Sequence, residues 1–532
     1  MKLSFFGAAH AVTGSCHCLE VGGKKILIDC GLQQGRDEHD DNALDFSPSY
    51  IDYVIVTHAH IDHSGRIPLL VKEGFQGQIF TTRLTGELLS IMLRDSAFIQ
   101  ESDAQWQNQK GKRAGRPEVE PLYTVADAEA ALEQIFTVEY GQTLDLCEGV
   151  KIRFTDIGHL LGSASIEVWL TEDGNTKKIV FSGDIGNKHQ PLLKDPTPTK
   201  EADYVVMEST YGDRMHPKDK LDYVAELTKV LQETLDRGGN VVIPSFAVGR
   251  TQEILYFLRK IKVGRLVKGH EDFPVYVDSP MAVEATGIFQ ENRYECFDDE
   301  AMEYVKEGIN PIAFSGLKLS ITSEESKAIN FDETPKVIIS ASGMCDAGRI
   351  RHHLKHNLWR EECTILFVGY QSVGTLGRAL VEGADEVKLF GETIQVRAQI
   401  RKLAGLSGHA DKEGLIEWIQ AFEEKPKKVF VVHGEDSACT AFTECLKIEY
   451  GQRAYAPYSG TEFDLISNKF TYEAAPVAVK KKTKPVTGVF ERLLASARRL
   501  LALVTKSEGV MTNKDMAKFA DQINSLCDKW EI

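Results

Sequence analysis

Thr57-His58-Ala59-His60-Ile61-Asp62-His63-Ser64-Gly65 contains four potential metal ligands within six residues. It directly follows the apolar run Tyr53–Val56, which predicts a buried strand. Side chains alternate along a strand, so the two histidines spaced by two point one way while the Asp-His pair curls around in the turn. Burying so many polar groups unpaired costs several kcal/mol, so packing does not explain the pattern. The stretch therefore predicts a metal site at a strand end, with more ligands than one ion can use.

Two further candidate ligands lie downstream, each where a loop leaves a predicted strand. His159 lies in Gly158–Ser163, and Asp184 lies in Phe181–Gly186. A histidine and a carboxylate on such loops would complete a two-metal site, in which one carboxylate bridges ions about 3.5–4 Å apart. Either residue alone would be weak evidence, and the site is predicted from all of these residues together.

Three more short motifs place polar residues beside apolar runs. They are Met207-Glu208-Ser209-Thr210-Tyr211-Gly212, Ser407-Gly408-His409-Ala410-Asp411 and Val431-Val432-His433-Gly434-Glu435. With the motifs above, they make the chain resemble the metallo-β-lactamase superfamily, and specifically its β-CASP ribonuclease branch, over roughly residues 1 to 465. Motifs A, B and C of that branch fall on Glu208, His409 and His433, and none of its motifs is missing.

The resemblance implies a complete set of metal ligands. One zinc ion would be held by His58, His60, His159 and Asp184, and the other by Asp62, His63, Asp184 and His433. Asp29, at the first motif of the family, would contact a ligand residue and would not bind an ion itself. Histidine nitrogen and carboxylate oxygen suit Zn²⁺, but they also suit Mn²⁺ or iron, so the sequence does not name the metal. We expect two Zn²⁺ per chain, with Mn²⁺ as the alternative.

The reaction expected of this site is phosphodiester hydrolysis. Two divalent ions that share a water lower its pKa and supply a bridging hydroxide, and their charge stabilises the phosphoryl transition state. The expected catalytic residues are Asp62, Glu208 and His409. His409 would protonate the leaving oxygen, with its pKa raised from about 6.5 by Glu208; the alternative is that His409 only contacts phosphate. Ser407 would donate a hydrogen bond to a non-bridging oxygen, as the equivalent position does in the family.

A second surface is predicted in the middle of the chain. Ser340–Arg349 leaves a predicted strand through a turn and enters a basic helix, so its backbone N–H groups could face an anion. The candidate contacts to RNA phosphate are Ser342, Gly343 and Arg349. Gly369–Arg378 is a similar turn, and both resemble β-CASP loops that line the cleft. For any single residue here, packing between domains is an equally open interpretation.

The predicted fold class is α/β: a metallo-β-lactamase αββα sandwich with an inserted parallel α/β β-CASP domain and a C-terminal helical extension. Short strands and turns dominate the first part of the chain, and strands alternate with helices in the middle. The predicted divisions are residues 1–212 and 387–468 for the two parts of the metallo-β-lactamase domain, 213–386 for the β-CASP domain, and 469–532 for a linker and the helical extension.

Length and composition fit an ordinary folded protein. The 532 residues leave room for about three to four domains, and 42% of them are hydrophobic. The formal net charge of −16 gives no overall attraction to polyanions, so binding of nucleic acid has to be local. Ten cysteines without a Cys-x-x-Cys pair favour a reducing compartment. No apolar stretch reaches the length of a signal peptide core or a membrane span, so we expect a cytoplasmic protein without membrane contact.

The C-terminal extension is interpreted from periodicity alone. Lys480–Pro485 reads as a solvated linker. The segment Val489–Val504 has apolar residues spaced by three and four opposite arginines, which predicts an amphipathic helix. Packing against the body or a partner chain, including a second copy in a homodimer, is favoured over a membrane-surface or RNA-binding helix.

The function that the sequence favours is a zinc-dependent ribonuclease that cuts single-stranded RNA endonucleolytically, with 5′-exonuclease activity as an addition. A DNA-directed β-CASP nuclease is one alternative, but those enzymes characteristically carry valine at motif C, where this chain has His433. A noncatalytic RNA-processing scaffold is another, but such subunits lose metal ligands. A small-molecule hydrolase would share the ligands without a reason for the inserted domain.

Overall fold

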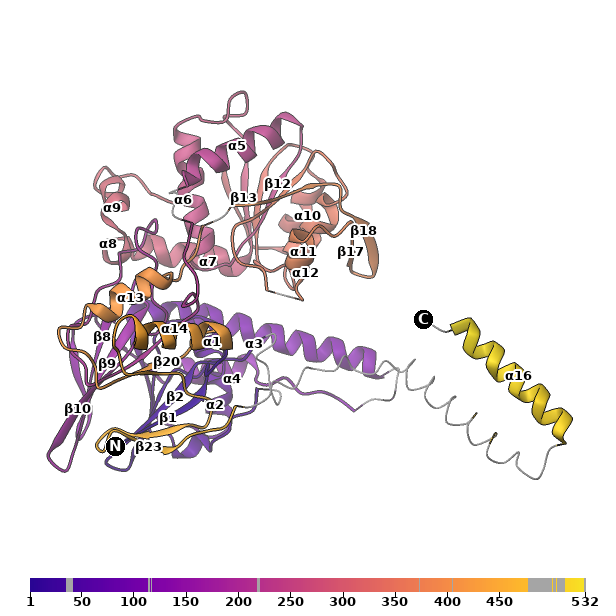
Figure 1. Ribbon diagram of the computed structural model, residues 1–532. Coiled ribbons are helices and arrows are strands. Elements are labelled where there is room, and N and C mark those ends of the chain that lie inside the picture. Colours follow the sequence, from indigo (N-terminus) through magenta and orange to yellow (C-terminus); the bar gives the residue numbers. More distant parts are fainter. Residues whose placement is uncertain are drawn as a thin grey trace. The chain divides into compact units, whose positions relative to one another are not determined.

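The computed structural model describes residues 1–34, 42–112, 115, 117–217, 221–372, 374–403, 405–476, 500, 504 and 512–530 (Figure 1). The chain forms two units, Met1–Ala474 and Ala475–Ile532, and each is described by itself. In the described part of the chain, no helix is long and apolar enough to cross a membrane.

Two sheets packed face to face form the first domain. The first sheet has the strand order β23 (Lys469–Tyr472), β22 (Glu462–Asp464), β1 (Lys2–Gly7), β2 (Cys16–Val21), β3 (Lys24–Ile28), β4 (Tyr53–Ile55), β5 (Gln78–Thr82) and β6 (Ile135–Val138). The second has the order β21 (Ala454–Tyr455), β20 (Lys428–Val431), β11 (Tyr204–Met207), β10 (Asn175–Phe181), β9 (Ala164–Glu172), β8 (Val150–Asp156) and β7 (Thr143–Cys147). Side chains that alternate inward from both sheets, such as Phe5, Ile28 and Phe430, form the core between them.

Helices cover the outer faces of this sandwich. On the first sheet lie α2 (Ile67–Lys72), α3 (Arg83–Lys112) and α4 (Val125–Leu132), and on the second lie α13 (Lys412–Gln420) and α14 (Asp436–Ile448). The predicted αββα sandwich is therefore confirmed. The predicted strands at Lys25–Asp29, Tyr53–Thr57 and Val429–Val432 correspond to β3, β4 and β20.

The inserted domain has one parallel sheet. Its order is β14 (Leu317–Ser320), β13 (Val275–Asp278), β15 (Val337–Ser340), β12 (Val241–Pro244), β16 (Thr364–Phe367) and β19 (Gln399–Lys402). One face packs on α5 (Tyr223–Asp236), α6 (Arg250–Val263) and α7 (Pro280–Glu291), and the other on α10 (Ser323–Phe331), α11 (Ile350–Asn357) and α12 (Leu376–Val381). Two short helices, α8 (Arg293–Cys296) and α9 (Asp299–Lys306), follow α7. The parallel α/β architecture agrees with the sequence-based prediction.

The inserted sheet continues beyond residue 386, where the sequence predicted that the domain ends. Val387–Leu389 reads as a strand of the first domain, but β17 (Glu386–Leu389) pairs only with β18 (Glu392–Gln395) among the described strands. β19 then pairs with β16, so the inserted sheet extends to Lys402. At the other end, β23 pairs with β22, so the sandwich reaches past the predicted boundary at 468.

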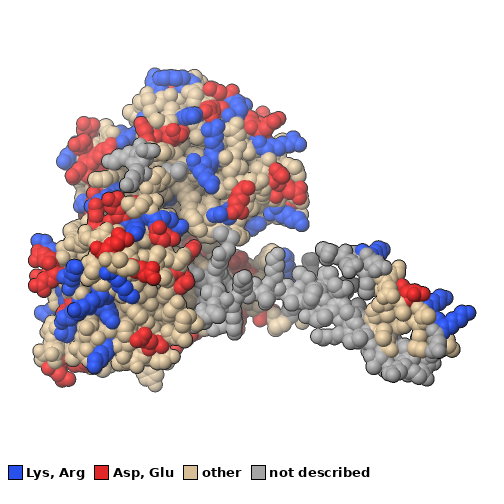
Figure 2. All heavy atoms as spheres, viewed as in Figure 1, with Lys and Arg blue, Asp and Glu red and all other residues tan. Residues whose placement is uncertain are grey.

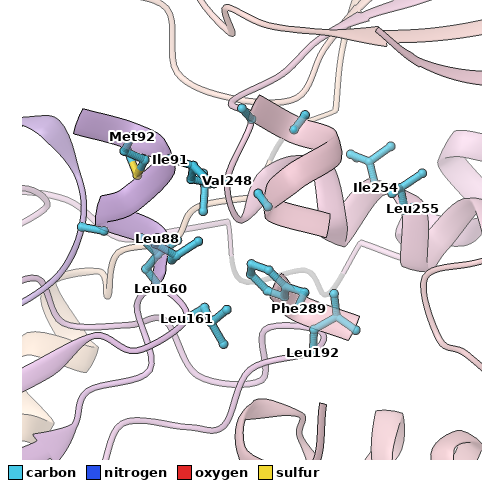
Figure 3. Close-up of a cluster of buried hydrophobic side chains, with 14 of the residues drawn as sticks. Leu88, Ile91, Met92, Leu160, Leu161, Leu192, Val248, Ile254, Leu255 and Phe289 are labelled. Carbon is cyan, nitrogen blue, oxygen red and sulfur yellow. The ribbon is translucent and has the colours of Figure 1, made fainter. Parts of the chain in front are cut away.

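A shared apolar cluster joins the two domains. Figure 3 shows Leu160 and Leu161 of the first domain close to Val248 and Phe289 of the inserted domain. Leu88 of α3 completes the contact on the side of the sandwich. Each such side chain contributes about 1.5–3 kcal/mol when it is fully buried. The cluster therefore fixes the inserted domain against the loop that follows β8.

The second unit is described mainly as one helix, α16 (Asn513–Trp530). The helix that the sequence predicts over Val489–Val504 lies outside the described residues, apart from Leu500 and Val504. The nine cysteines whose side chains the structure describes are free thiols, and eight of them are buried.

Candidate metal centre

Adjacent parallel strands bring the distant motifs together. β10, β11 and β20 are neighbours, with Phe181 paired to Val206 and Met207 paired to Val431. Because parallel strands end at the same edge of a sheet, the loops that follow them meet there. These loops carry Asp184, Glu208 and His433, and the loop after β4 brings the His-rich motif to the same place.

Four residues predicted to bind the first ion lie together. His58, His60, His159 and Asp184 place one ligand atom each within 4.8 Å of one another. Nδ1 of His60 lies 3.0 Å from Nε2 of His58 and 3.2 Å from Nε2 of His159. Oδ2 of Asp184 lies 3.5 Å from Nε2 of both His58 and His159.

The residues predicted to bind the second ion lie on the other side of Asp184. Asp62, His63 and His433 form a second group with ligand atoms within 4.8 Å. Nε2 of His63 lies 3.1 Å from Nε2 of His433 and 3.2 Å from Oδ1 of Asp184. Oδ2 of Asp62 lies 3.5 Å from Nε2 of His433. Asp184 thus turns one oxygen toward each group, as a bridging carboxylate would.

The donor set fits divalent metal ions. Imidazole nitrogens separated by 3.0–3.2 Å are close to the edge of about 3.3 Å of a tetrahedron whose bonds are about 2.0–2.1 Å long. Oδ1 of Asp184 is buried and accepts no hydrogen bond from the described residues. Its close neighbours are Nε2 of His63 at 3.2 Å and Nε2 of His433 at 3.6 Å, and a cation among these three atoms would satisfy the buried oxygen and both nitrogens. The residues present therefore suit the metal ions that the sequence predicts.

Contacts behind the ligands orient their rings. Oδ2 of Asp29 lies 2.7 Å from Nδ1 of His63, so this nitrogen donates and Nε2 is left to face an ion. The Gly408 carbonyl accepts from Nδ1 of His159 at 3.1 Å in the same way. Thr57 donates its backbone N–H to Asp29. Asp29 itself has a φ of 62°, so a strained backbone is held at this position.

Comparisons with known proteins agree with this geometry. A metallo-β-lactamase superfamily model matches residues 11–237, a Beta-Casp domain model matches 251–380, and a Zn-dependent metallo-hydrolase RNA specificity domain model matches 393–457. Ribonuclease TTHA0252 from Thermus thermophilus is 37% identical over 452 residues, which cover 84% of this chain and 96% of that protein. The chain belongs to the β-CASP ribonuclease family of the metallo-β-lactamase superfamily. It is a metal-dependent hydrolase.

Two further β-CASP relatives come from Methanocaldococcus jannaschii. Its transcription termination factor FttA is 34% identical over 472 residues, covering 86% of this chain and 70% of FttA. Its RNase J-like protein is 31% identical over 465 residues, covering 86% of this chain and 98% of that protein. The matched family models end at residue 457, before the second unit begins at Ala475.

The β-CASP motifs A and B meet beside the metal ligands. Nδ1 of His409 lies 3.2 Å from Oε1 of Glu208 and 3.9 Å from Oδ2 of Asp184. Burial lowers the pKa of His409, but Glu208 and Asp184 outweigh it and raise this pKa to about 9. Both carboxylates thus favour the protonated form of this imidazole. Its side chain is 23% exposed, so it can reach a substrate.

The histidines predicted to bind metal differ in the direction in which their surroundings shift the pKa. Burial, with His63 nearby, holds the pKa of His58 well below its usual value, which keeps that imidazole neutral. Burial also lowers the pKa of His63, but the carboxylates of Asp184 and Asp29 raise it well above its usual value. A bound cation would replace these protons, because histidine binds metal only as the neutral base.

Several residues that the sequence-based prediction did not single out also shape the site. Oγ1 of Thr210 lies 3.1 Å from Nδ1 of His433 and orients this ligand. His216 hydrogen-bonds to the carbonyl of His409 through Nε2 at 3.0 Å, and its backbone N–H donates to Asp411. Thr210 lies inside motif A, so its hydroxyl group could have been considered from the sequence. His216 lies outside every motif, and nothing in the sequence marks it as part of the site.

The predicted phosphate contacts occupy different environments. The hydroxyl of Ser407 accepts a hydrogen bond from the backbone N–H of His409 at 3.2 Å, which holds it close to the proposed general acid. Ser342 and Gly343 lie in the turn after β15, where the hydroxyl of Ser342 donates to the Ala347 carbonyl at 3.3 Å. The Arg349 guanidinium instead binds Asp278 at 2.7 Å inside the β-CASP domain. Its charge is therefore already paired, which favours the packing alternative at that position.

Proposed function

We propose that the chain hydrolyses phosphodiester bonds in single-stranded RNA at this centre, cutting within the strand. The observation that supports it most is His433 of motif C, because its Nε2 lies 3.1 Å from that of His63. DNA-directed members of the family characteristically carry valine at this position, which could not occupy it as a ligand. Degenerate scaffold subunits lack ligands that this chain retains.

The proposed cofactor is a pair of Zn²⁺ ions. His58, His60, His159 and Asp184 would hold one, and Asp62, His63, Asp184 and His433 would hold the other. When bound, two such ions would activate a water and stabilise charge on the phosphoryl group. Asp184 would keep the two ligand groups at a fixed separation, and Asp62 would add the negative charge that balances the second ion.

His409 would act as the general acid in this reaction. Its Nδ1 lies 3.2 Å from the Glu208 carboxylate, which favours the protonated ring, and the residue lies close to the ligands without belonging to either ligand group. Glu208 would hold the ring in place, since its carboxylate also accepts from the backbone N–H of Ile185 at 2.6 Å and is itself fixed. The proton would pass from His409 to the leaving oxygen, and Ser407 would donate a hydrogen bond to a non-bridging oxygen.

The proposed RNA contact is local. In Figure 2, Lys and Arg alternate with Asp and Glu over the visible face, and neither sign dominates it. With a net charge of −16, the protein as a whole does not attract a polyanion. The strand-end turns of the β-CASP domain offer backbone N–H groups instead, and Arg250 joins this domain to motif B by donating to the Leu406 carbonyl at 2.9 Å.

A digestion of 5′-labelled single-stranded RNA tests the proposal. The purified full-length chain is assayed for bound metal, and a 5′-triphosphate RNA, a DNA of the same sequence and a chelator arm are run beside the RNA. We expect internal cuts in RNA, no cuts in DNA and loss of activity with chelator. Single nucleotides released only from a 5′-monophosphate end would show exonuclease action instead. Metal-loaded protein that cuts no RNA would overturn the proposal.

A further inference from the structure

Phe246 is a large apolar side chain left open to solvent. It is the second residue after β12, and it is 45% exposed although its neighbours Ser245 and Ala247 are buried. Two more strand-end loops lie beside it, because β15 and β16 both pair with β12. In parallel α/β sheets, ligands bind at the carboxyl ends of the strands. An exposed aromatic ring at this edge is therefore at the position where such a sheet takes its ligand.

The ring of Phe246 rests on two glycines. A Cβ atom at Gly343 would lie 3.3 Å from Cδ2 of the ring, and one at Gly369 would lie 3.8 Å from Cε2. A side chain at Gly343 would crowd the ring, so glycine allows the ring to lie close against this turn. The ring is thus supported on one side by backbone while much of it stays accessible.

Hydrogen bonds hold this support in place. Nε2 of Gln371 donates to the carbonyls of Gly343 at 3.0 Å and Gly369 at 3.3 Å, which ties the two turns together. The hydroxyl of Thr251 donates to the carbonyl of Phe246 at 2.7 Å. A ring fixed in this way loses little conformational freedom when a ligand stacks on it.

The loop that carries Phe246 also touches the metal-centre loops. A Cβ atom at Gly249 would lie 3.2 Å from Cδ1 of Leu160, the residue after the ligand His159. Arg250 contacts Leu406, the residue before Ser407. Tyr370, 51% exposed, adds a second open aromatic side chain directly after Gly369. Two exposed aromatic side chains thus lie on strand-end loops of the β-CASP domain, and one of these loops contacts residues next to the metal centre.

We propose that Phe246 stacks on a nucleobase of the single-stranded RNA and sets which nucleotide reaches the metals. The inference rests on the proposed function, because it assumes that the substrate is RNA. Unpaired bases stack on aromatic side chains whatever their sequence, and loss of one such contact weakens binding by about 10-fold or more. This stacking would add affinity for RNA, which the negative net charge of the protein does not attract.

The test compares Phe246→Ala with Phe331→Ala. Phe331 is 76% exposed and ends α10 ahead of β15, so it lies in the same domain but away from the strand-end loops. Cleavage and binding of single-stranded RNA are measured with both variants, and cleavage of bis(p-nitrophenyl) phosphate reports on the metals without a nucleobase. We expect Phe246→Ala to lose at least about 10-fold more on RNA than on the small phosphodiester. Phe331→Ala should match the wild type on both substrates.

An abasic scan of the RNA identifies the stacked nucleotide. At one abasic position the wild type and Phe246→Ala should become equal, whereas elsewhere the difference between them should persist. Phe246→Trp should keep most of the RNA affinity and Phe246→Leu should lose it, because only the former retains a flat ring. Equal losses of Phe246→Ala on RNA and on the small substrate, or a difference that no abasic position removes, would overturn the stacking role. A wild type that cuts the small substrate but no RNA would instead show that the proposed function is wrong.

Discussion

Two buried clusters of histidine and aspartate lie at strand ends in this molecule, and they are built for different purposes. In the β-CASP domain, Asp278 accepts from Nε2 of His353 at 2.6 Å and from the Arg349 guanidinium at 2.7 Å. Ser320 and Ser326 donate to the same carboxylate at 2.8 and 2.6 Å. Both oxygens of Asp278 are used and its charge is paired, so this cluster needs no cation.

The cluster around Asp184 has the opposite character. Imidazole nitrogens face one another, and Oδ1 of Asp184 accepts no hydrogen bond from the part of the chain that the structure describes. In His58, His63, His159 and His433, the nitrogen that points away from the centre is the one with a hydrogen-bond partner outside the cluster. Residue type alone therefore does not distinguish a metal site from a packed polar cluster. The direction of the unused donor and acceptor atoms does.

The largest effect is expected for Asp184→Ala. Both ligand groups lose their shared carboxylate, so bound metal and RNA cleavage should be lost together, with activity falling by more than about 10³-fold. Metal is measured by elemental analysis on the same sample that is assayed with labelled RNA. Retention of metal and activity would mean that Asp184 does not bridge the two groups.

Asp278→Ala should have a large effect of a different kind. Removing the carboxylate leaves the buried His353 and the half-buried Arg349 without this partner, which should lower the free energy of unfolding by about 3–5 kcal/mol. Denaturation followed by circular dichroism measures the loss, and metal content should not fall in the variant at low temperature. A variant that loses metal while its stability is normal would show that the Asp278 cluster serves metal binding and not the stability of the fold.

The same carboxylate should give the protein an acid-dependent stability. Burial raises the pKa of Asp278, but the hydrogen bonds from His353 and Ser326 outweigh it and lower the pKa to about 2, below its ordinary value of 3.8. The stabilisation is thus complete above pH 3.8 and is lost as the pH falls through about 2. Denaturation of wild type and Asp278→Asn is compared across this range, and the difference in their free energies of unfolding should shrink as the pH falls through about 2.

A smaller loss is expected for His409→Ala. The residue lies outside both ligand groups, so metal content should be preserved while cleavage slows by about 10²-fold, the usual size of a general-acid contribution. His189→Ala is a suitable control, because that side chain is 74% exposed and its partner Asp195 is also on the surface. A His409→Ala variant with wild-type rates would leave His409 as no more than a phosphate contact.

The polar residues that meet at this centre stand out in the sequence because they follow apolar runs. The run Tyr53–Val56 predicts a strand, and the polar residues that follow it, from His58 on, must then lie at a sheet edge. Parallel pairing of β10, β11 and β20 brings three of these edges together, as the family resemblance implied. The domain boundary near residue 386 was harder to predict. Val387–Leu389 and Gln399–Lys402 are both short, and which sheet a short strand joins depends on tertiary pairing.

Contacts between distant residues were out of reach for the same reason. Arg349 has the charge and position of a phosphate ligand, and nothing near it in sequence indicates that Asp278 lies 2.7 Å away. His216 is equally isolated from motif B in sequence, although it hydrogen-bonds to His409. Such partners are supplied by neighbouring strands and loops that the periodicity of one segment does not specify.

The smallest effect on chemistry is expected from deleting residues 475–532. The described ligands and their supporting contacts all lie in Met1–Ala474, so RNA cleavage per chain should be unchanged. Met516, Phe519, Ile523 and Leu526 of α16 recur at spacings of three and four, and Leu526 is 53% exposed. An open apolar stripe of this kind favours association with another surface, so the deletion should lower self-association or RNA affinity. Light scattering and RNA binding of the two proteins measure this, and a deletion that abolishes cleavage while metal stays bound would give the extension a part in the reaction.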